Sequence, residues 1–237
     1  MYEVLGMKGG QAAAAAMAPA AARKRLEWKF ERGPKWDETL QSASRLRLAM
    51  GEEQRVAAVT GIEANDGPAR LAARLAFALA EIEKSPILLV DGSSTAPTLE
   101  TIFGLSATST LNPAAGLVDV LEGRSTLAAA LLEATPENLA FLPLGTSSQT
   151  PASLLATDAW SALLREARER FRYVVIAAGL PRKSAAAMLL SSLADGVVLA
   201  LARGVRRRDE VAAFQQELEN LKIPTLGAVL TRAAAKR

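Results

Sequence analysis

The sequence contains no histidine and no cysteine among its 237 residues. The protein therefore has no imidazole to act as a base or metal ligand, no thiolate nucleophile and no disulfide. The chemistry that remains is that of carboxylates, lysine, arginine, tyrosine and hydroxyl groups. No histidine or cysteine metal site is expected, and the lack of cysteine fits a reducing compartment.

Aromatic residues and long apolar runs are also scarce. Aromatic residues make up 5% of the chain against 50% for all hydrophobic residues, so we expect a core of alanine, leucine and valine. No apolar run reaches the ~18 residues expected of a membrane-spanning helix. The 28 basic and 25 acidic residues give a formal net charge of +3, which is too small to indicate nucleic acid as a partner.

Residues 1–36 differ in composition from the rest of the chain. The stretch "GGQAAAAAMAPAAA" is almost pure alanine, lacks a leucine-rich centre and is followed by "RKR". We interpret it as a flexible N-terminal segment in preference to a secretion signal. The sequence thus predicts a flexible segment over 1–36 and a single domain over 37–237.

The second half of that segment mixes basic and aromatic residues. The stretch "ARKRLEWKFERGPKW" carries six basic and two acidic residues. Such a pattern is typical of docking on an anionic membrane surface or an acidic partner. A solvated linker whose aromatic side chains fold back onto the domain is the alternative. The residues expected to dock are Arg23, Lys24, Arg25, Trp28, Phe30 and Trp36.

From residue 37 onward the chain alternates strand and helix patterns. Short apolar runs typical of buried parallel strands are "RVAAVT", "PILLVDG", "NLAFLPLG", "YVVIAAG", "GVVLALARG" and "TLGAVLTR". Helical patterns between them include "PARLAARLAFALAEIEK" and "ASLLATDAWSALLREARERF". This alternation predicts an α/β fold with a mostly parallel sheet and helices on both faces.

The stretch from Val56 to Ala76, "VAAVTGIEANDGPARLAARLA", has the layout of a phosphate-binding loop. A strand leads into a loop that ends at Gly67, and a helix follows. In such loops a lysine and then a serine or threonine come next, to bind phosphates and magnesium. Here Pro68 removes both the ammonium group and one N–H donor, and Ala69 removes the hydroxyl group. We expect the loop to be a structural turn. We also expect Arg70, two positions beyond the lysine position, to be a surface residue.

Taken in order, several segments resemble the bacterial tyrosine kinases of capsule and exopolysaccharide assembly, the BY-kinases, which are related to the MinD and ParA ATPases. The resemblance spans roughly residues 38–232. The segments that carry it are "PILLVDGSSTAPTLETIFGL", "GLVDVLEGRSTLAAAL", "NLAFLPLGTSSQTPASLLATDAWSALLREARERFRYVVI", "LADGVVLALARGVRRRDEV" and "IPTLGAVLTR". The resemblance implies a P-loop NTPase fold of the MinD, ParA and BY-kinase type.

The chain departs from the family where the family does its chemistry. The second acidic motif keeps Asp91, but its other acid falls on Ser93. The magnesium-binding Asp of the third motif falls on Ala177, and the base-contacting Asn falls on Thr231. The tyrosine-rich tail is absent from the sequence. The positions of this degenerate nucleotide site are Gly67, Pro68, Ala69, Asp91, Ala177 and Thr231. We expect Asp91 to cap the turn that follows it.

The resemblance therefore implies a pseudo-kinase in polysaccharide assembly, with no catalytic residues, no metal and no cofactor. Its implied partner is a membrane-embedded polysaccharide co-polymerase, or chain-length regulator, met on the cytoplasmic side of the inner membrane. One alternative is an active ATP- and magnesium-dependent kinase or ATPase whose site is completed by Arg70, Lys183 or a partner's residues. A MinD- or ParA-like positioning protein is the other alternative. Homo-oligomerisation stays open, although Gln41 and Ser44 stand where the family's ring-forming arginines would be.

Overall fold

The structure is a computed structural model that describes residues 25–26, 36–93, 98–105, 115–134, 136–145 and 152–232. The strands in it are β1 (Arg25–Leu26), β2 (Val56–Gly61), β3 (Ile87–Asp91), β4 (Leu132–Ala134), β5 (Leu139–Leu142), β6 (Tyr173–Gly179), β7 (Gly196–Ala202) and β8 (Thr225–Thr231). The helices are α2 (Trp36–Met50), the 3₁₀ turn η1 (Ala64–Asp66), α3 (Pro68–Ile82), α4 (Leu99–Ile102), α5 (Leu117–Leu121), α6 (Leu127–Ala130), α7 (Ala152–Leu155), α8 (Asp158–Arg170), α9 (Ala185–Leu193) and α10 (Arg208–Asn220).

The strands form one sheet in the order β1-β4-β5-β3-β6-β2-β7-β8. All neighbouring pairs are parallel except β4 with β5. The predicted mostly parallel sheet is confirmed, and all six predicted strands are present. The short strands β1 and β4 were not predicted, because two or three residues are too few to show a period in the sequence.

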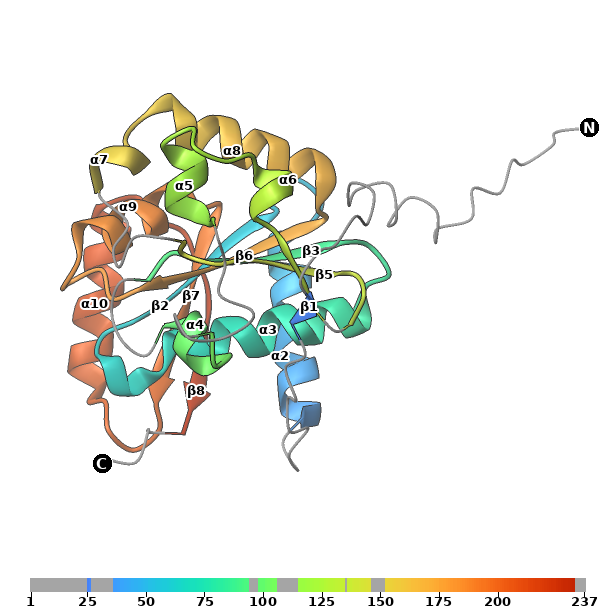
Figure 1. Cartoon of the computed structure of the whole chain (residues 1–237). Coiled ribbons are helices and arrows are strands. Elements are labelled where there is room, and N and C mark those ends of the chain that lie inside the picture. The colour runs from blue at the N-terminus through green and yellow to red at the C-terminus, as the bar shows by residue number, and fades with distance from the viewer. Residues whose placement is uncertain are drawn as a thin grey trace, which may run out of the picture.

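Helices cover both faces of the sheet, as the sequence predicted (Figure 1). Alternate residues of the central strand β2 divide between two cores: Ala57 and Val59 join one, and Val56 and Ala58 join the other. The first core includes residues of α2, α3 and α4, and the second includes residues of α5 to α10. This alternation is the period-2 geometry of a strand buried on both sides.

One predicted helix is divided in two. The stretch "ASLLATDAWSALLREARERF" forms α7 and then α8, with Thr157 as the N-cap residue of α8 in extended geometry. The Thr157 hydroxyl donates back to the Leu154 carbonyl at 2.6 Å, which satisfies an acceptor at the end of α7. Local hydrogen bonding of this kind competes with a continuous helix.

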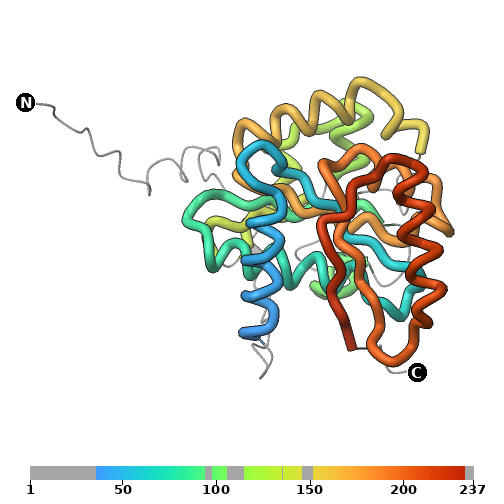
Figure 2. Tube along the Cα trace, turned by 180° about the vertical axis from the view of Figure 1, so that it is seen from behind, coloured from blue at the N-terminus to red at the C-terminus, as the bar shows by residue number. Residues whose placement is uncertain are grey.

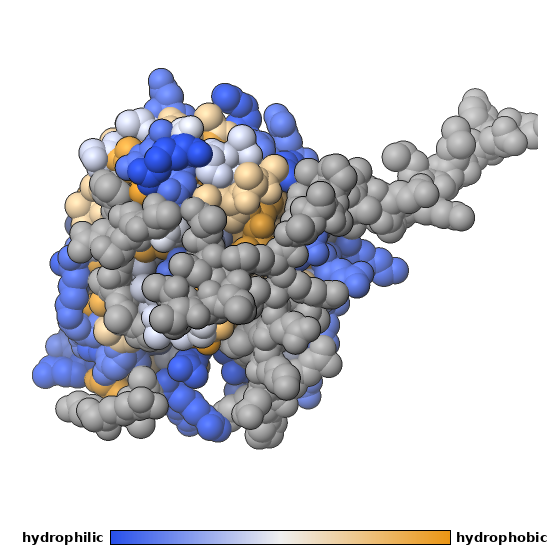
Figure 3. Space-filling view, viewed as in Figure 1, coloured by the Kyte–Doolittle hydropathy of each residue, from blue (hydrophilic) through white to orange (hydrophobic). Residues whose placement is uncertain are grey.

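On the surface seen in Figure 3, hydrophilic side chains lie mostly around the outline of the molecule. No helix among the described residues is long and apolar enough to cross a membrane.

Part of the N-terminal segment joins the domain. β1 pairs with β4, and Trp36 begins α2, which lies beside β8 and contacts α3 (Figure 2). The Trp36 ring is 8% exposed, its Nε1 donates to Glu81 at 3.1 Å, and the Arg74 guanidinium lies 5.9 Å from its centroid. For Trp36 the structure has the alternative arrangement, an aromatic side chain packed on the domain. Of the other docking residues, Arg23, Lys24, Trp28 and Phe30 lie outside the described residues, as does the side chain of Arg25, and docking stays a prediction.

Because the Trp36 ring is buried between α2 and α3, Trp36→Ala should lower the free energy of unfolding by about 3 kcal/mol. Urea unfolding followed by circular dichroism measures the change. Leu48→Ala on the same helix is the matched control, because Leu48 is 76% exposed and its truncation should cost less than about 0.5 kcal/mol. Equal effects of the two substitutions would contradict the packing described for Trp36.

Candidate nucleotide-fold loop and its surroundings

The loop between β2 and α3 lies at the carboxyl edge of the sheet, where α/β folds usually bind ligands. β2 is the central strand between β6 and β7, so the loop is flanked by the ends of both. The loop contains η1 and then Gly67, whose φ of 68° and ψ of 44° are left-handed. Pro68 is the first residue of α3, a position where its missing N–H leaves no bond unmade. The predicted turn into a helix is therefore present.

Most backbone donors of this loop bond within the loop. The N–H groups of Ile62 and Glu63 donate to the Asp66 carboxylate at 3.0 and 2.8 Å. The Asp66 N–H donates to the Glu63 carbonyl at 3.0 Å, and the Gly67 N–H donates to the Ala64 carbonyl at 3.1 Å. A phosphate-binding loop needs such N–H groups directed at its ligand. As arranged, these four residues do not present the donors of a phosphate cradle.

Asp66 holds the loop in place, and the sequence reasoning missed it. Its side chain is fully buried and also accepts from the Ala202 N–H at 2.8 Å and from Arg206 Nε at 2.9 Å. The carboxylate thus joins the loop to the end of β7 and to the approach to α10. The pair "ND" before Gly67 is a local turn signal, but the long-range partners could not be read from it.

Arg206 is the cation that offsets the cost of burying the Asp66 carboxylate. Its side chain is 11% exposed, and its guanidinium also donates to the Asn65 side chain and, at 3.1 Å, to Glu210. Burial opposes the charge of Arg206, but the hydrogen bond and Coulomb attraction to Asp66 outweigh burial and raise the pKa of Arg206. A buried charge that is paired and hydrogen-bonded in this way stays ionised.

Two further residues contact the same loop, one at the end of β8 and one shortly after β6. Thr231, at the end of β8, donates from its hydroxyl to the Asp66 carbonyl at 2.8 Å. Lys183, which follows β6, pairs with Glu63 of the loop. Lys183 therefore does face the loop, as the enzyme hypothesis required, but its ammonium group is engaged by a carboxylate there. Arg70 is exposed, as predicted.

Of the other three positions of the degenerate site, Ala69 is buried in the first turn of α3, and the remaining two lie side by side in the sheet. Asp91 ends β3 in register with Ala177 of β6, and both are fully buried. Asp91 accepts from the N–H groups of Ser93 at 3.3 Å and Glu100 at 3.2 Å, so it caps the turn and the start of α4. This geometry is the predicted capping role.

The charge of Asp91 is poorly compensated. Burial is the main cause that raises the pKa of Asp91 to about 7, and the nearby Glu100 carboxylate adds to it. Burial likewise raises the pKa of Glu100. Among the described residues Asp91 has no ion pair, and no group of three or more acidic, histidine or cysteine residues there could hold a metal ion. Asp91 is thus suited to keep a proton near neutral pH.

Comparison with known proteins confirms the resemblance seen in the sequence. No family model matches the chain. The chain is 28% identical over 172 residues to the tyrosine-protein kinase YwqD of Bacillus subtilis, covering 73% of this chain and 70% of that protein. It is 30% identical over 161 residues to the succinoglycan biosynthesis transport protein ExoP of Rhizobium meliloti, covering 67% of this chain but 20% of ExoP.

Solved structures agree on the fold. The kinase domain of the Escherichia coli tyrosine kinase ETK superposes with a TM-score of 0.75 at 18% identity, covering 92% of this chain and 86% of that domain. The cell division protein MinD of Aquifex aeolicus gives a TM-score of 0.59 at 20% identity, covering 76% and 70%. The chain is a relative of the bacterial tyrosine kinases and has the P-loop NTPase fold that their kinase domains share with MinD.

Because Asp66 is buried against Arg206 and three backbone N–H groups, Asp66→Asn should lower the free energy of unfolding by about 3 kcal/mol. Urea unfolding measures the loss. The matched control is Asp209→Asn, because the Asp209 carboxylate pairs with Arg207 where both side chains are mostly exposed. That control should cost less than about 1 kcal/mol. Similar losses in both variants would show that the Asp66 pair does not hold the loop.

The raised pKa of Asp91 predicts a pH dependence of stability. Between the unfolded pKa of 3.8 and the folded pKa of about 7 the folded protein binds the extra proton. This contribution is therefore present in acid and is lost as the pH rises through about 7. The shift corresponds to at most about 4 kcal/mol. Asp91→Asn should be more stable than the wild type near pH 8, and its advantage should be clearly smaller near pH 5, where the folded wild type keeps its proton.

Urea unfolding at both pH values measures this difference, and Asp158→Asn at an exposed position is the control. An advantage of Asp91→Asn that is the same at both pH values would rule out titration of Asp91 as its cause.

Proposed function

We propose that this protein is a non-catalytic relative of the BY-kinases that acts as a partner or regulator of a membrane-embedded polysaccharide co-polymerase. The process is exopolysaccharide, capsule or holdfast-type biosynthesis and export. The names of its relatives support the process: one is a tyrosine kinase and another a succinoglycan biosynthesis transport protein. In this proposal the protein works at the cytoplasmic face of the inner membrane, held there by its partner.

The main support for a non-catalytic protein is that several backbone N–H groups of the loop are already hydrogen-bonded. The N–H groups of Ile62, Glu63, Asp66 and Gly67 all bond within the loop, and Pro68 has none. Phosphoryl transfer depends on positioning and on neutralising the charge of the phosphates. A triphosphate at this loop would find these four donors already bonded and would lack the lysine that follows the glycine in active loops.

The rest of the site supports the same proposal. Ala177 offers no side-chain oxygen beside Asp91, so a magnesium ion would lack the second carboxylate of an active site. Thr231 uses its hydroxyl to hold the Asp66 carbonyl. No magnesium–nucleotide complex is expected as a cofactor.

An active kinase or ATPase is the second candidate, and the position of Lys183 favours it. Its ammonium group lies at the loop, so breaking the pair with Glu63 would free a cation there. The MinD- or ParA-like alternative has less support, because that class needs a lysine early in the loop and "GIEAND" has none.

Calorimetric titration with magnesium-ATP and magnesium-ADP tests the proposal on the full chain. We expect no saturable binding below millimolar nucleotide, because four of the loop donors are already bonded and the lysine is missing. The variant Pro68→Lys with Ala69→Ser restores the two side chains that active loops carry. It should lose about 0.4–1 kcal/mol of stability, since lysine lacks the fixed φ of proline. Nucleotide should not raise the melting temperature of this variant.

In cells that lack the gene, the wild type and the double variant should restore polymer export equally well. Micromolar binding of nucleotide by the wild type would overturn the non-catalytic proposal and favour the enzyme. Loss of binding on Lys183→Ala would then identify the cation that completes the site.

A further inference from the structure

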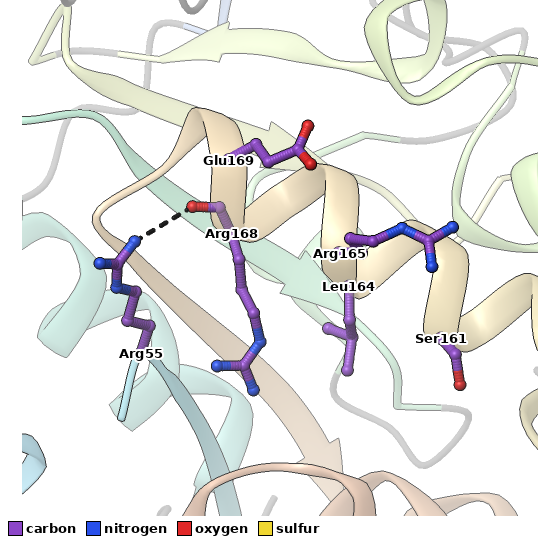
Figure 4. A pocket seen from close by; sticks show the side chains of 6 residues that line it. All are labelled: Arg55, Ser161, Leu164, Arg165, Arg168 and Glu169. Carbon is purple, nitrogen blue, oxygen red and sulfur yellow. Dashed lines mark hydrogen bonds between the residues drawn. The ribbon is translucent and has the colours of Figure 1, made fainter. Parts of the chain in front are cut away.

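A groove lies between the start of β2 and α8, and it is lined largely by arginines (Figure 4). Its volume is about 620 Å³. The residues that line it, here called the basic groove, are Arg55, Ser161, Leu164, Arg165, Arg168 and Glu169. Arg55 directly precedes β2, so the basic groove lies at the amino edge of the sheet. β2 has six residues. At about 3.3 Å per residue, they separate the groove from the loop by about 20 Å.

One of the three arginines is already neutralised. Arg168 donates to Asp195 at 2.6 Å. The backbone N–H groups of Arg55 and Val56 donate to the other oxygen of that carboxylate, at 2.7 and 2.8 Å. Burial alone would raise the pKa of Asp195, but these hydrogen bonds outweigh it and lower the pKa. Asp195 therefore stays ionised and fixes Arg168 as part of the groove wall.

The other two arginines keep most of their donors free. Arg55 donates from one Nη atom to the Arg168 carbonyl at 3.3 Å, a bond drawn in Figure 4, and makes no ion pair with the residues described. The Arg165 side chain is exposed and makes no hydrogen bond or ion pair within the described part of the chain. A guanidinium carries five N–H donors in a planar fork that matches a carboxylate. The groove thus presents two guanidinium groups that make no ion pair among the described residues, together with the Glu169 carboxylate and the largely buried side chain of Leu164.

We propose that the basic groove binds a short acidic segment of a protein partner, whose carboxylates pair with Arg55 and Arg165. Glu169 lines the same groove, so the partner must place its anionic groups at the two forks and away from this carboxylate, which a short peptide with spaced acidic residues can do better than a continuous polyanion. A peptide can place its carboxylates at the two forks and an aliphatic side chain next to Leu164. This inference does not rest on the proposed function, since the groove is remote from the loop.

The experiment uses the full chain and a fluorescein-labelled peptide of alternating glutamate and leucine as the probe. Fluorescence anisotropy should show micromolar binding that weakens when NaCl rises from about 0.02 M to about 0.15 M. Arg55→Glu with Arg165→Glu should weaken binding by at least about tenfold. Arg55→Lys with Arg165→Lys should weaken it less, because lysine keeps the charge but loses the fork.

The matched control is Arg203→Glu with Arg208→Glu, which changes the net charge equally at exposed positions near the carboxyl edge. It should leave the Kd unchanged, and melting curves of all variants should show folded protein. Equal weakening by both charge reversals, or equal binding of a lysine–leucine peptide, would overturn the proposal.

Vesicles of equal parts phosphatidylglycerol and phosphatidylcholine provide the second arm. If the chain binds these vesicles through Arg55 and Arg165 while the acidic peptide fails to bind, the groove is a membrane site and the peptide proposal is wrong. Nucleotide binding tests the loop alone and peptide binding tests the groove alone, so either proposal can fail without the other.

Discussion

The buried carboxylate of Asp66 is the contact on which the arrangement at the carboxyl edge of the sheet depends. It accepts from two N–H groups of its own loop, from the end of β7 and from Arg206. A buried carboxylate is costly unless it is paired and hydrogen-bonded, and removing either partner leaves an uncompensated charge. The loop, β7 and the approach to α10 therefore hold one another in a single arrangement, with Thr231 and Lys183 adding contacts from β8 and β6.

This arrangement explains how a loop can keep its shape without a ligand. In an active phosphate-binding loop, backbone N–H groups remain unpaired within the protein because the phosphates satisfy them. Here the Asp66 side chain and the 3₁₀ turn satisfy several of them, and Pro68 has no N–H to satisfy. Since buried backbone donors are nearly always paired, an internal carboxylate is one way to make the turn self-sufficient.

The fold could be predicted from the sequence more completely than the site. Apolar runs such as "YVVIAAG" indicate buried strands because each of their side chains enters one of two cores, and β6 is buried throughout. The local roles of Gly67, Pro68 and Asp91 could also be predicted, because Gly67 and Pro68 lie at the start of a helix and Asp91 lies at the end of a strand. The Asp66–Arg206 pair was not, because its members are 140 residues apart and only the sheet order brings them together. The break before α8 was not predicted either, because the helical pattern of the sequence continues through Thr157.

The two edges of the sheet carry opposite electrostatic arrangements. At the carboxyl edge, Arg206 and Lys183 are both engaged by carboxylates of the loop. At the amino edge, Asp195 engages the guanidinium of Arg168 but not those of Arg55 and Arg165, which line a groove. Internal pairing makes a surface rigid but removes its attraction for charged partners, whereas unpaired guanidinium groups keep that attraction. The proposed peptide site and the loop can therefore be altered separately, because the sheet lies between them and forms the common core of both edges.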